Sequence, residues 1–106
     1  MGHTEVEFDA QSYSRIMRAL AAPVRFRIIS LLREGELSVG EIISQVDQES
    51  TSIPFHLRTL LTAGLVVRED RGRTHFYRLQ PAVYQPGDRK TRPDRIDLGY
   101  CQIEFV

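Results

Sequence analysis

Two short apolar segments separated by a tight polar turn constrain the fold of this chain more than any other feature. Residues 39–46 and residues 52–63 space their apolar side chains three and four positions apart, as amphipathic helices do. Residues 47–50 between them are polar and leave room only for a turn. Ser38 and Glu41 form the capping-box pattern that begins a helix. The sequence therefore predicts a helix-turn-helix in the middle of the chain.

The start of the second helix of this pair is constrained by Pro54, which cannot donate a backbone hydrogen bond. An N-cap at Thr51 or Ser52 places that proline in the first turn, where no helical bond is lost. Gly64 follows the last apolar residue and is placed to end the helix. We therefore expect a helix that runs from about residue 52 to about residue 63.

Helices and a hairpin are predicted on either side of this pair. Residues 10–21 have amphipathic spacing, and residues 23–33 form a more uniformly apolar helix that starts at a proline. Residues 65–69 and 74–79 are β-rich runs around a polar turn that contains glycine, which is typical of a hairpin. The order of elements predicts a winged helix-turn-helix, mainly α with a β-hairpin wing.

The C-terminal quarter is expected to be irregular and then extended. Residues 81–95 contain three prolines and are interpreted as a linker, whereas residues 95–106 resemble one strand. The apolar side chains of that strand alternate between two faces, with a change of phase at Gly99 that indicates a β-bulge. The strand either adds an edge to the wing or serves dimerisation or partner binding.

These patterns divide the chain into three parts. Residues 1–9 are interpreted as a flexible arm, residues 10–80 as one winged helix-turn-helix domain, and residues 81–106 as a linker and strand that are candidates for dimerisation or sensing. A length of 106 residues suits one modest core. No apolar run is long enough to span a bilayer, no signal peptide is visible, and a single cysteine is typical of a reducing cytoplasm.

Charge is unevenly distributed although the formal net charge is zero. Residues 30–49 carry one arginine against five acidic residues, and residues 50–80 carry five arginines against two acidic residues. The corresponding net charges are −4 and +3. A locally basic face is what binding to nucleic-acid phosphates requires, so the region from residue 50 to residue 80 is the candidate interface.

Double-stranded DNA is the expected partner, because a helix fits the major groove and polar side chains can contact phosphates and base edges. The candidate DNA-binding residues lie on the second helix of the pair and at the wing tip: Thr51, Ser52, Phe55, His56, Arg58, Thr59, Arg71 and Arg73. For Phe55 a core position and an outward position both stay open. His3 and His75 have no partner ligands at a useful spacing and are interpreted as ordinary surface residues.

Five stretches in three regions of the chain resemble the ArsR/SmtB family of winged-helix repressors. They are Leu20-Ala21-Ala22-Pro23-Val24-Arg25-Phe26-Arg27-Ile28-Ile29 in the first helices, Ser50-Thr51-Ser52-Ile53-Pro54-Phe55-His56-Leu57-Arg58-Thr59-Leu60 in the recognition helix, and Ala63-Gly64-Leu65-Val66 with Arg71-Gly72-Arg73 and Phe76-Tyr77-Arg78-Leu79 in the wing. The resemblance covers about residues 10–80. It implies a homodimer, formed through the first helix and a C-terminal segment, that represses transcription.

The chain departs from the family pattern at its sensor sites. Ser38 and Gly40 stand where a thiolate metal site would need cysteines, and no histidine follows His75, so no metal site and no cofactor are expected. Pro54 replaces a serine of the recognition helix. Cys101 is either a small buried hydrophobic residue or a sensor thiol that pairs across a dimer.

The predicted function is sequence-specific binding of a homodimer to a roughly palindromic DNA operator, as a repressor. A winged helix that docks proteins without binding DNA is the main alternative. Arginines gathered on one face would favour DNA, and arginines scattered or paired internally would favour docking. Enzymatic activity is not expected, because the sequence lacks a nucleophile–base pair and a glycine-rich phosphate loop.

Overall fold

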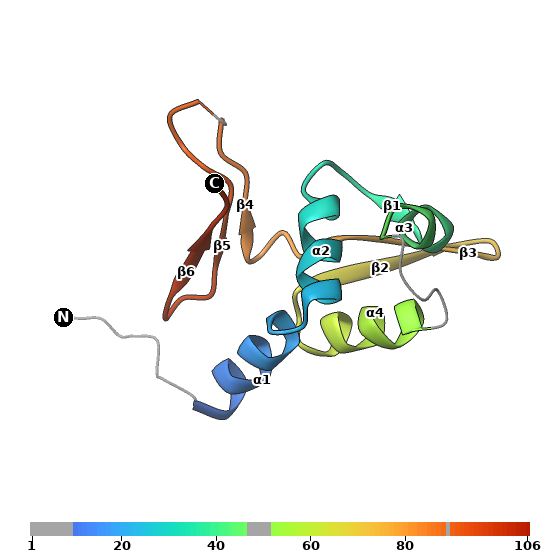
Figure 1. Cartoon of the computed structure of the whole chain (residues 1–106), viewed down its shortest axis with the longest axis horizontal. Coiled ribbons are helices and arrows are strands. Elements are labelled where there is room, and N and C mark those ends of the chain that lie inside the picture. The colour runs from blue at the N-terminus through green and yellow to red at the C-terminus, as the bar shows by residue number, and fades with distance from the viewer. Residues whose placement is uncertain (1–9, 47–51, 89) are drawn as a thin grey trace.

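The computed structural model describes residues 10–46, 52–88 and 90–106 (Figure 1). The expectations for the arm of residues 1–9, for the turn at residues 47–50 and for Thr51 lie outside the described residues. The helices are α1 (Ala10–Leu20), α2 (Pro23–Leu32), α3 (Val39–Val46) and α4 (Ile53–Thr62). The strands are β1 (Leu37–Ser38), β2 (Val66–Arg71), β3 (Thr74–Leu79), β4 (Tyr84–Gln85), β5 (Arg95–Asp97) and β6 (Gln102–Glu104).

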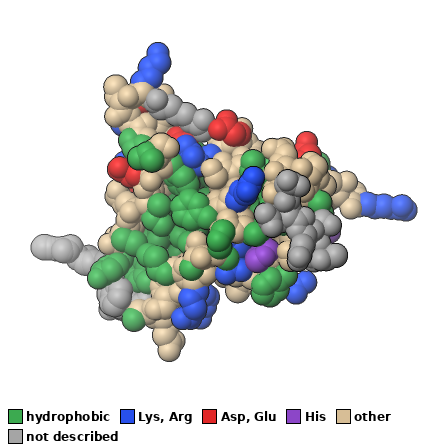
Figure 2. All heavy atoms as spheres, in the orientation of Figure 1, with side chains coloured by type: hydrophobic (Ala, Val, Ile, Leu, Met, Phe, Trp, Pro, Cys, Tyr) green, Lys and Arg blue, Asp and Glu red, His purple; other side chains and the backbone are tan. Residues whose placement is uncertain are grey.

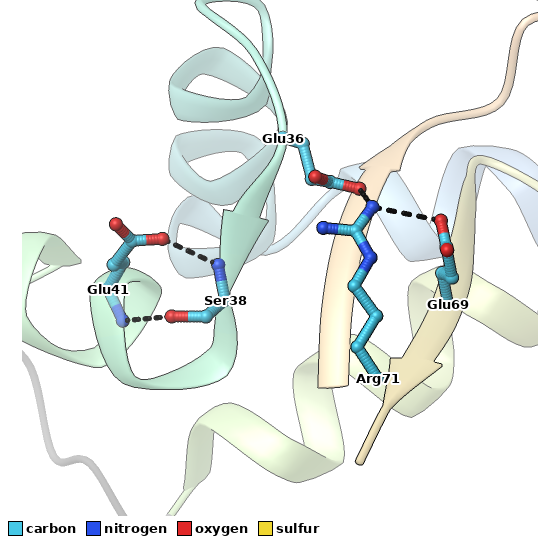
Figure 3. A network of polar contacts seen from close by, with 5 residues as sticks. All are labelled: Glu36, Ser38, Glu41, Glu69 and Arg71. Atoms are coloured by element: carbon cyan, nitrogen blue, oxygen red, sulfur yellow. Dashed lines mark hydrogen bonds and ion pairs between the residues drawn. The ribbon is translucent and has the colours of Figure 1, made fainter. Parts of the chain in front are cut away.

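All four predicted helices are confirmed to within about one residue at the described ends. Helix α2 begins at Pro23, where the missing N–H costs nothing. Helix α3 begins with the predicted capping box: the N–H of Glu41 donates to Ser38 Oγ (3.1 Å), and the N–H of Ser38 donates to Glu41 Oε1 (2.8 Å; Figure 3). These two bonds satisfy backbone donors that no helical carbonyl reaches.

Helix α4 starts and stops where its sequence predicts. Pro54 lies in the first turn, and Ser52 occupies the N-cap position, but its side chain makes no capping hydrogen bond. The predicted position is confirmed and the hydroxyl cap expected of Ser52 is wrong, while the alternative cap, Thr51, lies outside the described residues. At the other end Gly64 adopts φ +80°, and the N–H of Leu65 donates to the carbonyl of Leu60 (3.0 Å), as in a Schellman motif.

The wing is a three-stranded antiparallel sheet in the order β1-β3-β2, rather than the predicted two-stranded hairpin. Strand β1 has two residues, too few to show alternation in the sequence, and it pairs Leu37 with Tyr77. Gly72 turns the chain between β2 and β3 with φ +63°. Buried apolar side chains from the helices and the base of the wing form one core, which includes Ile28, Ile29, Ile42, Val46, Ile53, Leu57, Leu60, Leu65, Val66, Tyr77 and Leu79.

The C-terminal quarter corrects two expectations. The predicted linker contains strand β4, and the predicted single strand is a hairpin of β5 and β6, so a separate sheet forms in the order β4-β5-β6. Gly99, at φ +85°, lies in the turn of this hairpin and is not a bulge, and the N–H of Leu98 donates to the carbonyl of Cys101 (2.9 Å). The sheet does not join the wing, so that alternative is wrong.

An ion pair and an aromatic contact fix the C-terminal sheet to helix α2. Asp94 is 1% exposed and accepts hydrogen bonds from Arg33 Nε (3.0 Å) and from the N–H of Gly87 (2.8 Å). The Arg33 guanidinium lies over the ring of Phe105, 4.3 Å from its centroid, and that ring lies 5.8 Å from the ring of Phe26. The sheet is therefore part of the same packed unit as the helices.

Candidate nucleic-acid interface

Helix α4 has one buried stripe and one outward face. Ile53, Leu57 and Leu60 are almost fully buried and hold the helix against the core. The side chains of Pro54, Phe55, Arg58 and Thr62 are exposed, and those of His56 and Thr59 are half-exposed. Phe55 is 59% exposed, so of its two alternatives, a core position and an outward position, the outward one is correct. The outward face thus combines an apolar ring, a cation and hydroxyl groups.

Arg25 of helix α2 contacts both the end of α1 and helix α4. Its Nε donates to the carbonyl of Ala19 (2.7 Å) and its Nη2 donates to the carbonyl of Arg18 (3.1 Å). Both carbonyls belong to the last turn of α1, where a cation is favourable, and the carbonyl of Arg18 also accepts from the N–H of Ala21 (3.2 Å). Nη1 of Arg25 lies 3.1 Å from Nδ1 of His56, so one guanidinium connects α1, α2 and α4.

This contact defines the state of His56. A guanidinium can only donate, so Nδ1 of His56 must accept and the neutral ring carries its proton on Nε2. Burial, and second the charge of Arg25, lower the pKa of His56. A neutral His56 can donate one hydrogen bond to a phosphate or a base edge, but it contributes no positive charge.

The lowered pKa of His56 predicts how the stability of the fold depends on pH. The unfolded chain protonates first as the pH falls below the ordinary histidine value of 6.5, so the free energy of unfolding falls with it. A His56→Asn variant keeps an acceptor near Arg25 but does not titrate. Urea unfolding at about pH 7.5 and about pH 5.5 should show a smaller pH-dependent loss for this variant than for the wild type. Equal losses in the two proteins would contradict this assignment.

The hydroxyl of Thr59 has a local role that sequence reasoning missed. The hydroxyl of Thr59 donates to the carbonyl of Phe55 one turn earlier (3.1 Å), so its oxygen is left mainly as an acceptor. Phosphate oxygens are acceptors too, and Thr59 has to give up this bond to contact them. The contact predicted for Thr59 stays a prediction.

At the wing tip the two predicted arginines have different surroundings. Arg71 donates through Nη2 to Glu36 Oε2 (2.7 Å) and to Glu69 Oε1 (2.9 Å; Figure 3). Its guanidinium also lies over the ring of Phe76. The hydrogen bond from Arg71 lowers the pKa of Glu69. Arg73 is exposed and forms no ion pair with any residue in the described ranges.

Arg68 and His75 are site candidates that sequence reasoning missed. The strand register pairs Arg68 with Tyr77 and Asp70 with His75, on the same side of the sheet as Val66 and Leu79. Arg71 lies on the opposite side, because side chains alternate along a strand. Residues two positions apart on a strand share a face, so Arg68 lies on the same face as the apolar Val66. This spacing could have identified Arg68 from the sequence.

Cys101 lies beside α1. It is half-buried and lines a hollow of about 550 Å³ together with Tyr13, Met17 and Tyr100. The ring of Tyr100 packs 5.2 Å from that of Tyr13 and is 61% exposed. Across the residues that the structure describes, no three His, Cys, Asp or Glu side chains gather as metal ligands. The sensor role of Cys101 stays a prediction.

A helix-turn-helix followed by a wing, with a basic and polar outward face on its second helix, defines the class of winged helix-turn-helix proteins. Residues 22–67 match the sequence family described as "Bacterial regulatory protein, arsR family". The transcriptional activator HlyU of Vibrio cholerae is 32% identical over 102 residues, which are 96% of this chain and 90% of HlyU. The chain belongs to the ArsR family of transcriptional regulators, as its resemblance predicted.

Other relatives agree with this assignment. The transcriptional repressor SmtB of Mycobacterium tuberculosis is 41% identical over 64 residues, which are 60% of this chain and 47% of SmtB, so the chain spans about half of that protein's length. The solved structure of HlyU gives a TM-score of 0.64 at 31% identity, covering 71% of this chain and 82% of that chain.

A homodimeric winged helix-turn-helix DNA-binding domain, Mb0332 from Mycobacterium bovis, gives a TM-score of 0.64 at 29% identity, covering 68% of this chain and 67% of that chain. In the part of this chain that the structure describes, no helix has the length and apolar character needed to cross a membrane.

Proposed function

We propose that this protein binds a roughly palindromic operator in double-stranded DNA as a homodimer and represses transcription there. The outward face of α4 is the observation that carries the proposal. This face is free of the core, it carries Arg58 and hydroxyl groups, and the wing lies beside it. A recognition helix needs this arrangement to enter the major groove while neighbouring elements contact the backbone. Such a regulator works in the compartment that holds the DNA, the cytoplasm.

The proposed interface combines α4 with the wing tip. Phe55, His56, Arg58 and Thr59 face the groove, and Ser52 lies at the N-cap of the helix. The contact predicted for Thr51 stays a prediction, because Thr51 lies outside the described residues. Arg73 contacts the backbone beside it. Arg71 contributes less, because reaching a phosphate requires it to leave Glu36 and Glu69.

Arginines that pair within the chain were expected to favour the docking alternative. Arg71, which pairs with Glu36 and Glu69, is the candidate arginine that supports it. Arg58 and Arg73 favour DNA, because neither forms an ion pair among the described residues. Two free arginines on and beside an outward helix leave cations available for phosphate. The arginines of the candidate interface therefore favour DNA binding over protein docking.

The proposed dimer surface is the apolar side of α1 together with the turn between β5 and β6. Hydrophobic side chains gather over this part of the molecule (Figure 2). Met17 is 41% exposed and Tyr100 is 61% exposed, so both present apolar area to solvent in the isolated chain. Exposed apolar patches of this kind mark protein contacts. The homodimeric state of Mb0332 supports a second copy of this chain as the partner.

Repression is favoured by relatives named as repressors, SmtB among them, and the name of HlyU favours activation as the second candidate. A promoter–reporter fusion distinguishes the two. Repression predicts that reporter output rises when the gene is deleted. A fall in output on deletion would replace repression by activation without affecting the proposed DNA binding.

The direct test is a binding titration against the DNA upstream of the protein's own gene, from about 50 mM to about 200 mM salt. Wild-type affinity should fall steeply with salt. Arg73→Ala should make the log–log slope shallower by about 1.8, because each of two copies loses one phosphate contact worth about 0.9. Arg71→Ala is the matched control and should change the slope less. No binding by the wild type, or slopes that rank the two variants in the opposite order, would contradict the proposed interface.

A further inference from the structure

We propose that the hollow between helix α4 and the wing binds one phosphate group of the DNA backbone, held by Arg58 and Arg68. This inference rests on the proposed function and deepens it, because it adds Arg68 of the wing to the interface and assigns Arg58, at the edge of the recognition face, a backbone phosphate that the two arginines share. Its ligand chemistry is a phosphate oxyanion. The DNA backbone supplies that group at regular intervals, and free inorganic phosphate is the other source.

The hollow is built by three elements that converge on one side of the wing. It has a volume of about 210 Å³, which is room for more than one water molecule. Its lining residues come from the start of α3, from the flank of α4 that faces the wing, and from the near side of the sheet: Val39, Pro54, Leu57, Arg58, Leu61, Arg68, His75 and Tyr77. A phosphate with a few bridging waters fits a hollow of this size.

The register of the wing decides which arginine faces α4. Arg68 is opposite Tyr77, which is 6% exposed and belongs to the core side of the sheet. Arg78 is opposite Val67, one position along each strand, and therefore lies on the back of the sheet. The two arginines belong to the same sheet, but only Arg68 lines the hollow.

A hydrogen-bonded chain orients Arg68. Its Nε lies 3.0 Å from Asp70 Oδ1 and its Nη2 lies 3.4 Å from Asp70 Oδ2. Nδ1 of His75 lies 2.7 Å from Asp70 Oδ1, and since a carboxylate only accepts, His75 is the donor. Asp70 is a positioning residue here, because it occupies one edge of the guanidinium and leaves Nη1 of Arg68 available to a ligand.

The charge balance favours an anion in the hollow. Arg58, Arg68 and Asp70 give a net charge of +1 with His75 neutral. The back of the wing holds Arg71 and Arg78 against Glu36 and Glu69, so these four side chains give zero. Of the two sides of the wing, the side toward α4 is therefore the one that attracts a phosphate. Guanidinium groups also match phosphate geometry better than ammonium groups do.

The test compares Arg68→Gln with Arg78→Gln, which remove the same charge from opposite sides of one sheet. Both are titrated with the upstream DNA between about 50 mM and about 200 mM salt. Arg68→Gln should make the slope shallower by about 1.8 per dimer and weaken binding about tenfold, whereas Arg78→Gln should stay within about twofold of the wild type. Arg58→Gln should reproduce the change in slope. Thermal unfolding of each variant establishes that it is folded.

The other outcomes distinguish a failure of the phosphate site from a failure of the proposed function. Equal slopes for Arg68→Gln and Arg78→Gln, with wild-type DNA binding intact, would overturn the phosphate site and leave the proposed function standing. No DNA binding by the wild type would overturn both. A titration of the wild type with inorganic phosphate at constant ionic strength separates the two sources. Saturable phosphate binding that Arg68→Gln abolishes, with DNA affinity unchanged, would replace the DNA backbone by free phosphate as the ligand.

Discussion

Replacing Tyr100 with glutamate is expected to convert the dimer to monomers and to weaken operator binding by about two orders of magnitude or more. Tyr100 is 61% exposed in the isolated chain and packs on Tyr13 of α1. A second copy that covers this surface would bury the new carboxylate without a partner, at a cost of several kcal/mol. A monomer binds only one half-site, so it loses the gain of about 10²- to 10⁴-fold that comes from binding two linked sites.

Sedimentation and operator titration measure the two parts of this prediction separately. Gln85→Glu is the matched control, because it adds the same charge to an exposed position of the same sheet, in β4. It should leave both the sedimentation coefficient and the affinity unchanged. A Tyr100→Glu protein that still sediments as a dimer would contradict the proposed dimer surface. It would not affect the assignment of the recognition face.

Removing the carboxylate of Asp94 is expected to destabilise the fold much more than removing an exposed carboxylate does. Asp94→Ala should lower the free energy of unfolding by about 3 kcal/mol or more, which is typical when one partner of a buried ion pair is lost. Asp94 is 1% exposed, and the substitution removes the acceptor for Arg33 and for the N–H of Gly87. The C-terminal sheet then loses its ionic attachment to α2.

Asp70→Ala is the control for this measurement. Asp70 also pairs with an arginine, but its side chain is 50% exposed, so its loss should change the free energy of unfolding by about 0–1 kcal/mol. Urea unfolding followed by circular dichroism compares the two variants. Similar losses for Asp94→Ala and Asp70→Ala would show that the Arg33–Asp94 pair does not anchor the sheet.

The helical part of the fold could be predicted from sequence because its signals are local. The capping box of Ser38 and Glu41 and the position of Pro54 each restrict a helix start to within a residue or two. Apolar spacing over eight to eleven residues then shows which face is buried. Each of these signals lies within one helix or at its ends, so no knowledge of tertiary contacts is needed to read it.

The C-terminal sheet could not be predicted in the same way. Strands β4 to β6 have two or three residues each, too few for a period of two to stand out. Tyr84 pairs with Ile96, which lies twelve positions later in the chain. The prolines between the two residues led to the interpretation of this segment as a linker. The pairing depends on contacts with α2, such as Arg33 with Asp94, that no local pattern reveals.

The candidate site was predicted in part for a similar reason. The recognition helix could be assigned because its buried stripe identifies the opposite, outward face. At the wing tip, proximity in sequence favoured Arg71 and Arg73 together, but the structure pairs Arg71 with Glu36, thirty-five residues earlier. Alternation along β2 separates Arg68 from Arg71 by face, so that of these two arginines only Arg68 lines the hollow beside α4.

Hydroxyl-radical footprinting of the complex with the upstream DNA tests the central claim most directly. Two copies of α4 in successive major grooves on one side of the duplex should protect two symmetry-related patches with centres about 10 base pairs apart, or a multiple of that spacing. Cleavage between them on the far side should be unaffected. A single patch without dyad symmetry, or uniform cleavage at a protein concentration that saturates binding, would contradict the account.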